Sequence, residues 1–215
     1  MKGSQSQGIR KAKAEQTVLA LKEAARKLFA ERGYLATKIT DILAEAGRSA
    51  GVFYDHFASK EELLEALIAD FQSDAAAGAA AMDCAADEHD LSDRSQLRAH
   101  IEVFWRTYTS HLPVMVAMFQ ASMVDEGVTA GFGEWLNTTM LHQHLEHLEK
   151  RGVALAGEPA LLASALSSML LQFAYVWLAT DGRAPGGTGA RSAPSADEAV
   201  DMLTSLIHNG IVAKN

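Results

Sequence analysis

Apolar residues recur along this chain at intervals of three and four, the spacing that places them on one face of a helix. No segment shows the alternation of apolar and polar residues that marks a half-buried strand, and no internal repeat is present. The sequence therefore predicts an all-α protein. The predicted helices span residues 14–32, 37–46, 49–55, 61–80, 97–111, 113–124, 133–151, 159–179 and 195–209.

Two short helices joined by a tight turn are predicted within residues 37–60. Thr37 is placed to cap the first helix, because its hydroxyl can accept a hydrogen bond from an amide of the first turn. Gly47 follows the last apolar residue of that helix, where a left-handed residue often ends a helix. Ser49 is placed to cap the second helix. Such a pair is a helix-turn-helix, whose second helix can enter the major groove of DNA.

The predicted second helix has small residues at its start, which let its backbone approach DNA closely. The candidates for contacts with base edges are Arg48, Ser49, Ala50 and Val52, and Gly51 permits the close approach. Hydroxyl, imidazole and ammonium groups nearby can bond phosphate oxygens. The candidates for phosphate contacts are Thr37, Lys38, Thr40, Tyr54, His56 and Lys60.

Sixteen positions of this region agree in order and spacing with one known family, so that residues 14–70 resemble a TetR-type repressor. The residues that carry the resemblance are Gly33-Tyr34, Ala36-Thr37, Ile42, Ala46-Gly47, Ser49, Gly51, Tyr54, His56-Phe57, Ser59-Lys60-Glu61 and Leu63. Arg48 stands where the family usually has valine, and Ala50 and Val52 stand where longer or hydroxylated residues are common. The DNA sequence that is read therefore cannot be taken from a relative.

The resemblance implies a three-helix DNA-binding domain at the N-terminus, followed by a helical domain for ligand binding and dimerisation. We place the DNA-binding domain at residues 14–60 and the second domain at residues 61–215. Residues 1–13 lack apolar periodicity and are expected to form a disordered arm.

Charge is divided unevenly along the chain, which has a net charge of −8. Residues 1–60 contain 11 Lys and Arg against 6 Asp and Glu, whereas residues 61–215 contain 8 against 21. The basic segment coincides with the helix-turn-helix, which favours attraction to phosphate. A single cysteine, Cys84, excludes an internal disulfide and is typical of a cytoplasmic protein. We expect no secretory leader and no membrane-spanning segment.

An excess of methionine and aromatic residues surrounds Pro113, which is expected to break the chain into two helices. Methionine adapts to irregular shapes, and ligand cavities between helices are often lined in this way. With the support of the resemblance, we predict a pocket for a small apolar or amphipathic effector. Its candidate residues are Trp105, Tyr108, Met115, Met118, Phe119, Trp135, Met140 and Phe173.

The 159–179 helix is apolar almost all round and must be covered on most faces. Composition allows burial within one subunit, whereas the resemblance implies that this helix and the last one pair with their copies in a four-helix homodimer interface. The candidate interface residues are Leu162, Leu166, Met169, Leu170, Phe173, Val200, Leu203 and Ile207.

His142, His144, Glu146 and His147 invite a metal site, but they do not share one helical face, and we predict solvated or pocket-edge histidines instead. No motif for catalysis or for a cofactor is recognised, so we expect no metal, no cofactor and no enzyme activity. The leading hypothesis is a ligand-responsive homodimeric regulator that binds a near-palindromic double-stranded DNA operator. A ligand-independent DNA-binding protein of the same fold and a small helical carrier protein remain alternatives.

Overall fold

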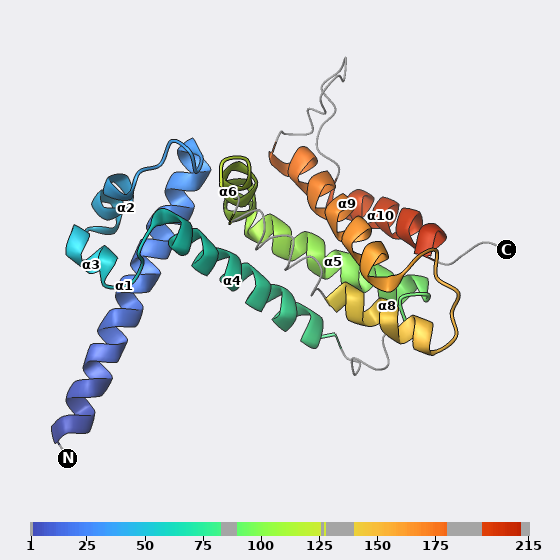
Figure 1. Ribbon diagram of the computed structural model, residues 1–215, viewed down its shortest axis with the longest axis horizontal. Helices are drawn as coiled ribbons and strands as arrows, with labels where there is room; N and C mark the ends of the chain where they lie inside the picture. Colours follow the sequence, from blue (N-terminus) through green and yellow to red (C-terminus); the bar gives the residue numbers. More distant parts are fainter. Residues whose placement is uncertain (1, 83–89, 126, 128–139, 180–194, 212–215) are drawn as a thin grey trace. The chain divides into compact units, whose positions relative to one another are not determined.

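A computed structural model of the chain describes residues 2–82, 90–125, 127, 140–179 and 195–211. Within these residues the chain is all-α and contains no strand, as the sequence predicts (Figure 1). The helices are α1 (Lys2–Arg32), α2 (Ile39–Ala46), α3 (Ala50–Tyr54), α4 (Lys60–Ala80), α5 (Arg94–Ser110), α6 (Leu112–Ser122), α8 (Met140–Lys150), α9 (Pro159–Ala179) and α10 (Ala196–Ile211).

The chain divides into two compact units, which are described separately. The first unit comprises residues 1–70 and 113–125, and the second comprises residues 71–112 and 126–215. This division differs from the boundary that we placed after residue 60, because α4 contributes to both units and α6 belongs to the first. The first half of α4 is held to α1 by Lys22, whose ammonium donates to the carbonyl of Ala66 at 2.9 Å and to Asp70 at 2.7 Å.

Helix α1 begins at Lys2, so the prediction of a disordered arm over residues 1–13 is wrong at the level of secondary structure. The arm contains two glycines but no proline. Once the amphipathic part beyond residue 14 is helical, each further residue adds a hydrogen bond at little cost, and nothing in the arm stops that growth. At the other end, Gly33 adopts a φ of 80°, and its amide donates to the carbonyl of Phe29.

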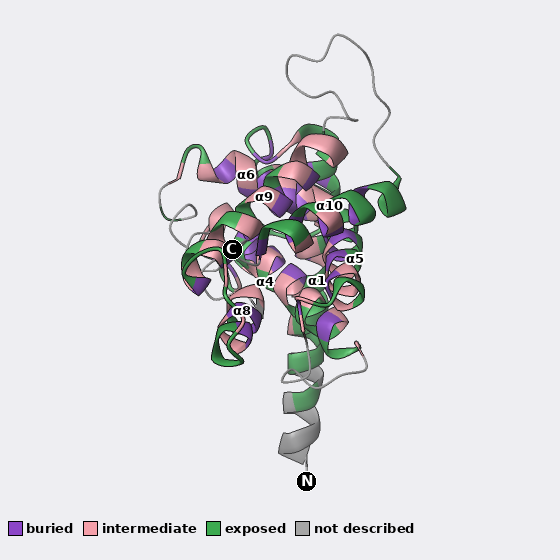
Figure 2. Ribbon diagram, turned by 90° about the vertical axis from the view of Figure 1, so that its right-hand side faces the viewer, coloured by how far each residue is buried: buried purple, intermediate pink, exposed green. Residues whose placement is uncertain are grey.

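The first unit is built around almost completely buried residues of α1, α2 and α4, among them Leu21, Ile42 and Leu63. Figure 2 colours the helices by burial. Helix α2 ends at Ala46 and is followed by the C-cap residue Gly47, whose φ of 61° is the left-handed conformation that we predicted. Its start differs from the prediction, because Lys38 rather than Thr37 occupies the N-cap position. The amide of Lys38 donates to the carboxylate of Asp41 at 3.0 Å, so an acidic side chain of the first turn satisfies it.

The second unit contains α5, α8, α9 and α10, and α5 packs against α10. Asp93 caps α5 by accepting from the amides of Ser95 and Gln96 at 2.9 and 3.0 Å. Ser195 and Glu198 cap α10 reciprocally, as predicted: the Ser195 amide donates to the Glu198 carboxylate at 2.9 Å, and the Glu198 amide donates to the Ser195 hydroxyl at 3.2 Å. The predicted bounds of α9 are confirmed.

Candidate DNA-binding surface and apolar cavity

Helices α2 and α3 form the predicted helix-turn-helix. The turn between them is closed by the amide of Arg48, which donates to the carbonyl of Leu43 at 3.0 Å. Helix α3 has five residues and is anchored by Phe53, which is completely buried and contacts the ring of Phe57 at 5.8 Å between centroids. One buried aromatic therefore fixes the orientation of α3 and leaves its other residues available.

The opposite face of α3 is open to solvent. Tyr54 is 59% exposed, and its ring lies edge-on to Phe53. Of the predicted DNA-contacting residues, Val52 and His56 are half-buried, and those that are exposed are Lys38, Thr40, Arg48, Ser49, Ala50, Gly51 and Tyr54. Ser49 stands at the N-cap position, but its side chain makes no capping hydrogen bond, unlike the prediction. The contacts of these residues with DNA stay predictions.

Thr37 is placed differently from the prediction. It is 1% exposed, and its hydroxyl donates to the carbonyl of Gly33 at 2.7 Å. This hydroxyl therefore faces the end of α1, where a phosphate oxygen cannot reach it. The sequence could not reveal this, since a threonine after a glycine-containing turn can cap the following helix or bond back to the preceding one.

Replacing Thr37 by valine tests this role. The substitution keeps the shape of the side chain and leaves the Gly33 carbonyl without its donor, which is expected to lower the free energy of unfolding by about 1–3 kcal/mol. The dependence of DNA affinity on salt concentration should stay the same, because no phosphate contact is lost. A shallower salt dependence at unchanged stability would show that Thr37 bonds DNA after all.

Lys60 also has partners within the protein. Its ammonium donates to the carbonyls of Tyr34 and Thr37 at 2.9 and 3.0 Å and lies 3.9 Å from the centre of the Tyr34 ring. Burial lowers the pKa of this ammonium. Lys60 thus fastens the loop between α1 and α2 to the start of α4. Its third hydrogen is all that remains for the predicted phosphate contact, which stays a prediction.

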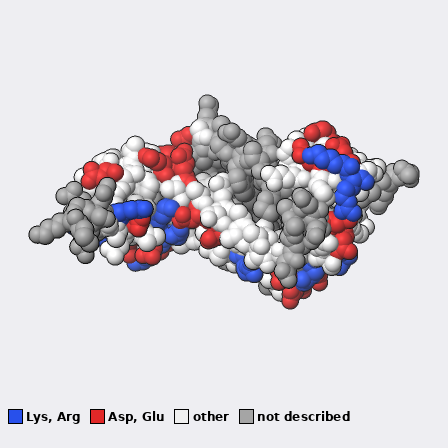
Figure 3. Space-filling model, turned by 90° about the horizontal axis from the view of Figure 1, so that it is seen from below, with Lys and Arg blue, Asp and Glu red and all other residues white. Residues whose placement is uncertain are grey.

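Much of the positive charge of the first unit is paired. Lys27 contacts Glu45 at 2.6 Å, Arg32 contacts Asp41 at 3.3 Å, and Arg26 contacts Asp70. On the face drawn in Figure 3, Lys and Arg side chains accordingly lie next to Asp and Glu side chains. Within the residues that the structure describes, Arg48 makes no ion pair. Its guanidinium is exposed at the start of α3, where it is placed to meet a negatively charged partner.

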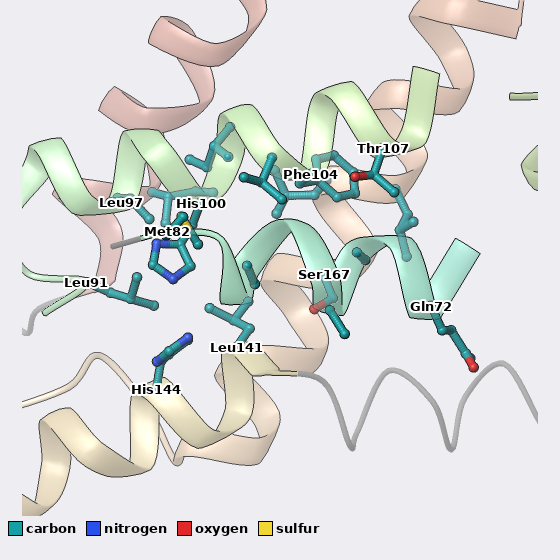
Figure 4. A pocket seen from close by; sticks show the side chains of 18 of the residues that line it. Gln72, Met82, Leu91, Leu97, His100, Phe104, Thr107, Leu141, His144 and Ser167 are labelled. Carbon is teal, nitrogen blue, oxygen red and sulfur yellow. The ribbon is translucent and has the colours of Figure 1, made fainter. Parts of the chain in front are cut away.

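The second unit contains a cavity of about 290 Å³ between α4, α5, α8, α9 and α10 (Figure 4). Its walls are mostly apolar. The lining residues are Phe71, Gln72, Ala75, Ala76, Ala79, Met82, Leu91, Leu97, His100, Ile101, Val103, Phe104, Thr107, Leu141, His144, Ser167, Leu170, Leu171 and Ile207.

Of the residues predicted for the pocket, none whose side chain the structure describes lines this cavity. Trp105 and Tyr108 are buried but do not line it: the Trp105 ring lies 6.0 Å from that of Phe173, and the Tyr108 ring lies 5.7 Å from that of the lining residue Phe104. The Phe173 ring in turn lies 6.0 Å from that of Trp177. Met115, Met118 and Phe119 belong to α6 in the first unit. Trp135 and the side chain of Met140 lie outside the described residues.

Few polar groups line the cavity, and two of them are histidines. The rings of His100 and His144 lie edge to face, with centroids 4.9 Å apart. His144 is 5% exposed, in line with the pocket-edge histidine that the sequence suggested, whereas His100 was missed. On the other side of α8, His142 approaches Glu146 at 3.6 Å. Thr107 and Ser167 add hydroxyl groups to the lining.

The predicted interface residues divide into two groups. Leu170, Val200, Leu203 and Ile207 are buried inside the unit, which leaves them little surface for a second copy. For the three residues of α10 the reason is that this helix packs against α5 within the same chain. Leu162, Leu166, Met169 and Phe173 are half-buried. Large apolar side chains that are exposed on these two helices, and that the prediction missed, are Leu161, Met202 and Leu206.

Helix α9 is also incompletely covered as a whole. Its most apolar window of 18 residues has a mean hydropathy of 1.6, yet only 28% of that window is buried within this chain. By length and composition alone α9 could cross a membrane. This is weak evidence for a membrane span, because the core helix of a soluble protein passes the same test.

Comparison with known proteins points to one family. Residues 21–67 match the family described as bacterial regulatory proteins, tetR family. The HTH-type transcriptional repressor KstR2 of Mycobacterium tuberculosis is 49% identical over 51 residues, which make up 24% of this chain and 26% of that repressor. The chain therefore matches only about a quarter of the length of this relative.

Solved structures are similar over nearly the whole chain. A TetR-family transcriptional regulator from Syntrophomonas wolfei has a TM-score of 0.74 and 18% identity, with 94% of this chain and 99% of that chain covered. At this identity the likeness shows the fold alone. The TetR family transcriptional regulator PfmR from Thermus thermophilus has a TM-score of 0.57 and 28% identity, with 89% and 97% of the two chains covered.

Proposed function

From the match of residues 21–67 to the tetR family of bacterial regulatory proteins, we propose that the chain is a homodimeric, ligand-responsive transcriptional repressor. The observation that carries the proposal is an exposed surface formed by Arg48, in the turn before α3, and by Ala50 and Gly51 of α3, the helix that the buried Phe53 anchors. The repressor function of KstR2, which matches this unit alone, supports the direction of control.

The DNA site follows from the symmetry of a dimer. Each copy places α3 in a major groove, and successive major grooves on one face of the duplex lie about 34 Å apart. The operator is therefore a near-palindrome. Selection of bound duplexes from a random pool tests this directly: a recovered motif with two inverted half-sites one helical turn apart supports the proposal. Absence of any enrichment at low salt would leave the alternative of a helical carrier protein.

The effector enters the cavity of the second unit. A cavity of about 290 Å³ with mostly apolar walls suits a small apolar or amphipathic molecule. Helix α4 forms one wall from Phe71 onwards and is part of the first unit up to Asp70. An effector releases DNA if it binds more tightly to the conformation of α4 that does not fit the operator. If no ligand raised the melting temperature, the ligand-independent alternative would be favoured.

The second copy covers the exposed apolar face of α9 and α10. Leu161 is 70% exposed, Leu206 is 54% exposed, and Met202 lies one helical turn before Leu206. These residues supply the contacts that the buried residues Leu203 and Ile207 cannot. Helix α9 is only partly buried within a single chain, which supports the proposal that a second copy covers this surface.

Leu206→Glu tests the dimer. A twofold axis repeats the substitution in the other copy, so two carboxylates would be buried without partners, and we expect the dissociation constant of the dimer to rise by more than about 100-fold. Molar mass measured by sedimentation at micromolar concentration should change from that of a dimer to that of a monomer. Leu35→Glu, at a residue of the first unit that is 57% exposed, serves as the control and should stay dimeric. A dimeric Leu206→Glu variant would place the interface elsewhere.

A further inference from the structure

We propose that the first part of α1, residues 2–16, binds the phosphate backbone of duplex DNA outside the half-site that α3 contacts. We call this segment the α1 extension. The inference rests on the proposed function of the chain as an operator-binding dimer, and it adds a second contact surface whose partner is flanking DNA of any sequence. It follows from the exposure of the extension, from its charge and from the pairing of the other cations of α1.

The α1 extension is free of packing against the rest of the first unit wherever its side chains are described. Thr17 is the first residue of α1 that is buried, whereas the described residues before it are exposed or half-buried. Figure 1 shows the start of α1 continuing past α2 and α3. At 1.5 Å per residue, the extension is about 22 Å long. A helical surface of this length is therefore open to a partner.

The extension carries an excess of positive charge. Residues 2–16 contain four Lys and Arg, and Glu15 is the only acidic residue among them. Lys13 is exposed and makes no ion pair with any residue that the structure describes. Lys11 approaches Glu15 only to 3.9 Å, and both side chains are more than half exposed, so this pair contributes little. Both ammonium groups are thus available to a polyanion.

The part of α1 beyond Thr17 uses its cations within the protein instead. The ion pairs there are those of Lys22 and Arg26 with Asp70, of Lys27 with Glu45 and of Arg32 with Asp41. The change from paired to available cations coincides with the end of burial on the same helix. Positive charge that is confined to the unburied end of a helix, in the unit proposed to bind DNA, is the pattern expected for contacts with phosphates.

The direction of the extension along the duplex follows from the symmetry of the proposed dimer. Half-sites one helical turn apart leave about 34 Å between the two copies of α3. Two copies of the extension, which have like charge and measure about 45 Å end to end, do not fit into that distance. They therefore run outward from the half-sites. At 3.4 Å per base pair, each extension covers roughly six or seven base pairs of flanking duplex.

The length of the flanking DNA tests this contact in the full-length protein. Two duplexes carry the selected operator with either two or ten base pairs outside each half-site, and dissociation constants are measured by fluorescence anisotropy over a range of salt concentrations. We expect the longer duplex to be bound at least about tenfold more tightly in 0.1 M salt. Its affinity should also depend more steeply on salt, because each neutralised phosphate adds about 0.9 to the logarithmic slope.

Lys11→Gln/Lys13→Gln removes four charges from the dimer. On the longer duplex we expect a slope that is shallower by about two to four, and the preference for long flanks should fall below about threefold. The melting temperature should not change, since both lysines are exposed. Lys11→Arg/Lys13→Arg keeps the charge and should keep the preference. Lys150→Gln removes an exposed lysine of the second unit and should keep it as well.

Equal affinity of the unmodified protein for the two duplexes would overturn the proposed contact, and specific binding of the shorter duplex would then leave the operator-binding function intact. A preference for long flanks that the double glutamine variant retained in full would also overturn it, because the lysines would not carry the contact. If neither duplex were bound at any salt concentration, the proposed function would fail together with this inference.

Discussion

Replacement of Gly51 by glutamate is expected to abolish operator binding while the protein stays folded. Gly51 lies within α3, is exposed, and a Cβ built at this position meets no atom within 4 Å. The protein therefore has room for a longer side chain. A bound duplex has no such room, because the residue faces the groove in the proposed complex. A carboxylate at this position would also face the phosphates.

We expect the affinity of Gly51→Glu for the operator to fall by at least about 100-fold, in line with the several kcal/mol that like charges cost when brought together at an interface. The melting temperature should change little, since the substitution replaces a glycine within an exposed helix. Gly51→Ala is the matched control: it adds only a methyl group and should keep measurable binding. Normal operator affinity of Gly51→Glu would show that α3 does not enter the groove.

The second large effect is expected for Phe53→Ala. Phe53 is completely buried and is the anchor of a helix that is only five residues long. Truncation of a buried phenylalanine typically costs about 3–5 kcal/mol. Since whole domains are stable by only about 5–15 kcal/mol, we expect the first unit to be largely unfolded or close to unfolding. DNA binding should be lost with the fold.

Urea unfolding followed by circular dichroism measures this effect. Leu35→Ala removes an apolar side chain that is 57% exposed and should cost less than about 0.5 kcal/mol. A loss of less than 1 kcal/mol for Phe53→Ala would mean that α3 is held mainly by other contacts. Loss of DNA affinity without loss of stability would point to a role of Phe53 in the DNA interface itself.

The fold was largely predictable because its signals are local. Apolar spacing located the helices, and glycines marked the ends of several of them. Gly33, Gly47 and Gly152 all have positive φ values at the predicted helix ends. The extension of α1 to Lys2 escaped prediction, because nothing in the sequence of the arm favours helix and nothing prevents it.

The cavity was not predictable in the same way. Helix α5 has apolar residues on more than one face, and sequence spacing cannot tell which face lines a cavity and which packs on a neighbour. Trp105 and Tyr108 were predicted because they belong to the cluster of aromatic residues and methionines around Pro113, whereas the α5 residues that line the cavity include His100, Phe104 and Thr107. The same ambiguity affected α10, where Leu203 and Ile207 face the interior and Leu206 faces outward. Which face of a helix finds a partner is decided by tertiary packing.

The position of the indole rings has a practical consequence. The chain has three tryptophans, at positions 105, 135 and 177, and none of them is among residues 1–70 and 113–125, which make up the first unit. Trp105 is 4% exposed and lies beside Phe173. Tryptophan fluorescence, excited selectively at the long-wavelength edge of protein absorption, will therefore report on the proposed effector-binding unit. It will contain no signal from the proposed operator-binding unit. The melting of the second unit can thus be followed by itself, without any dye or label.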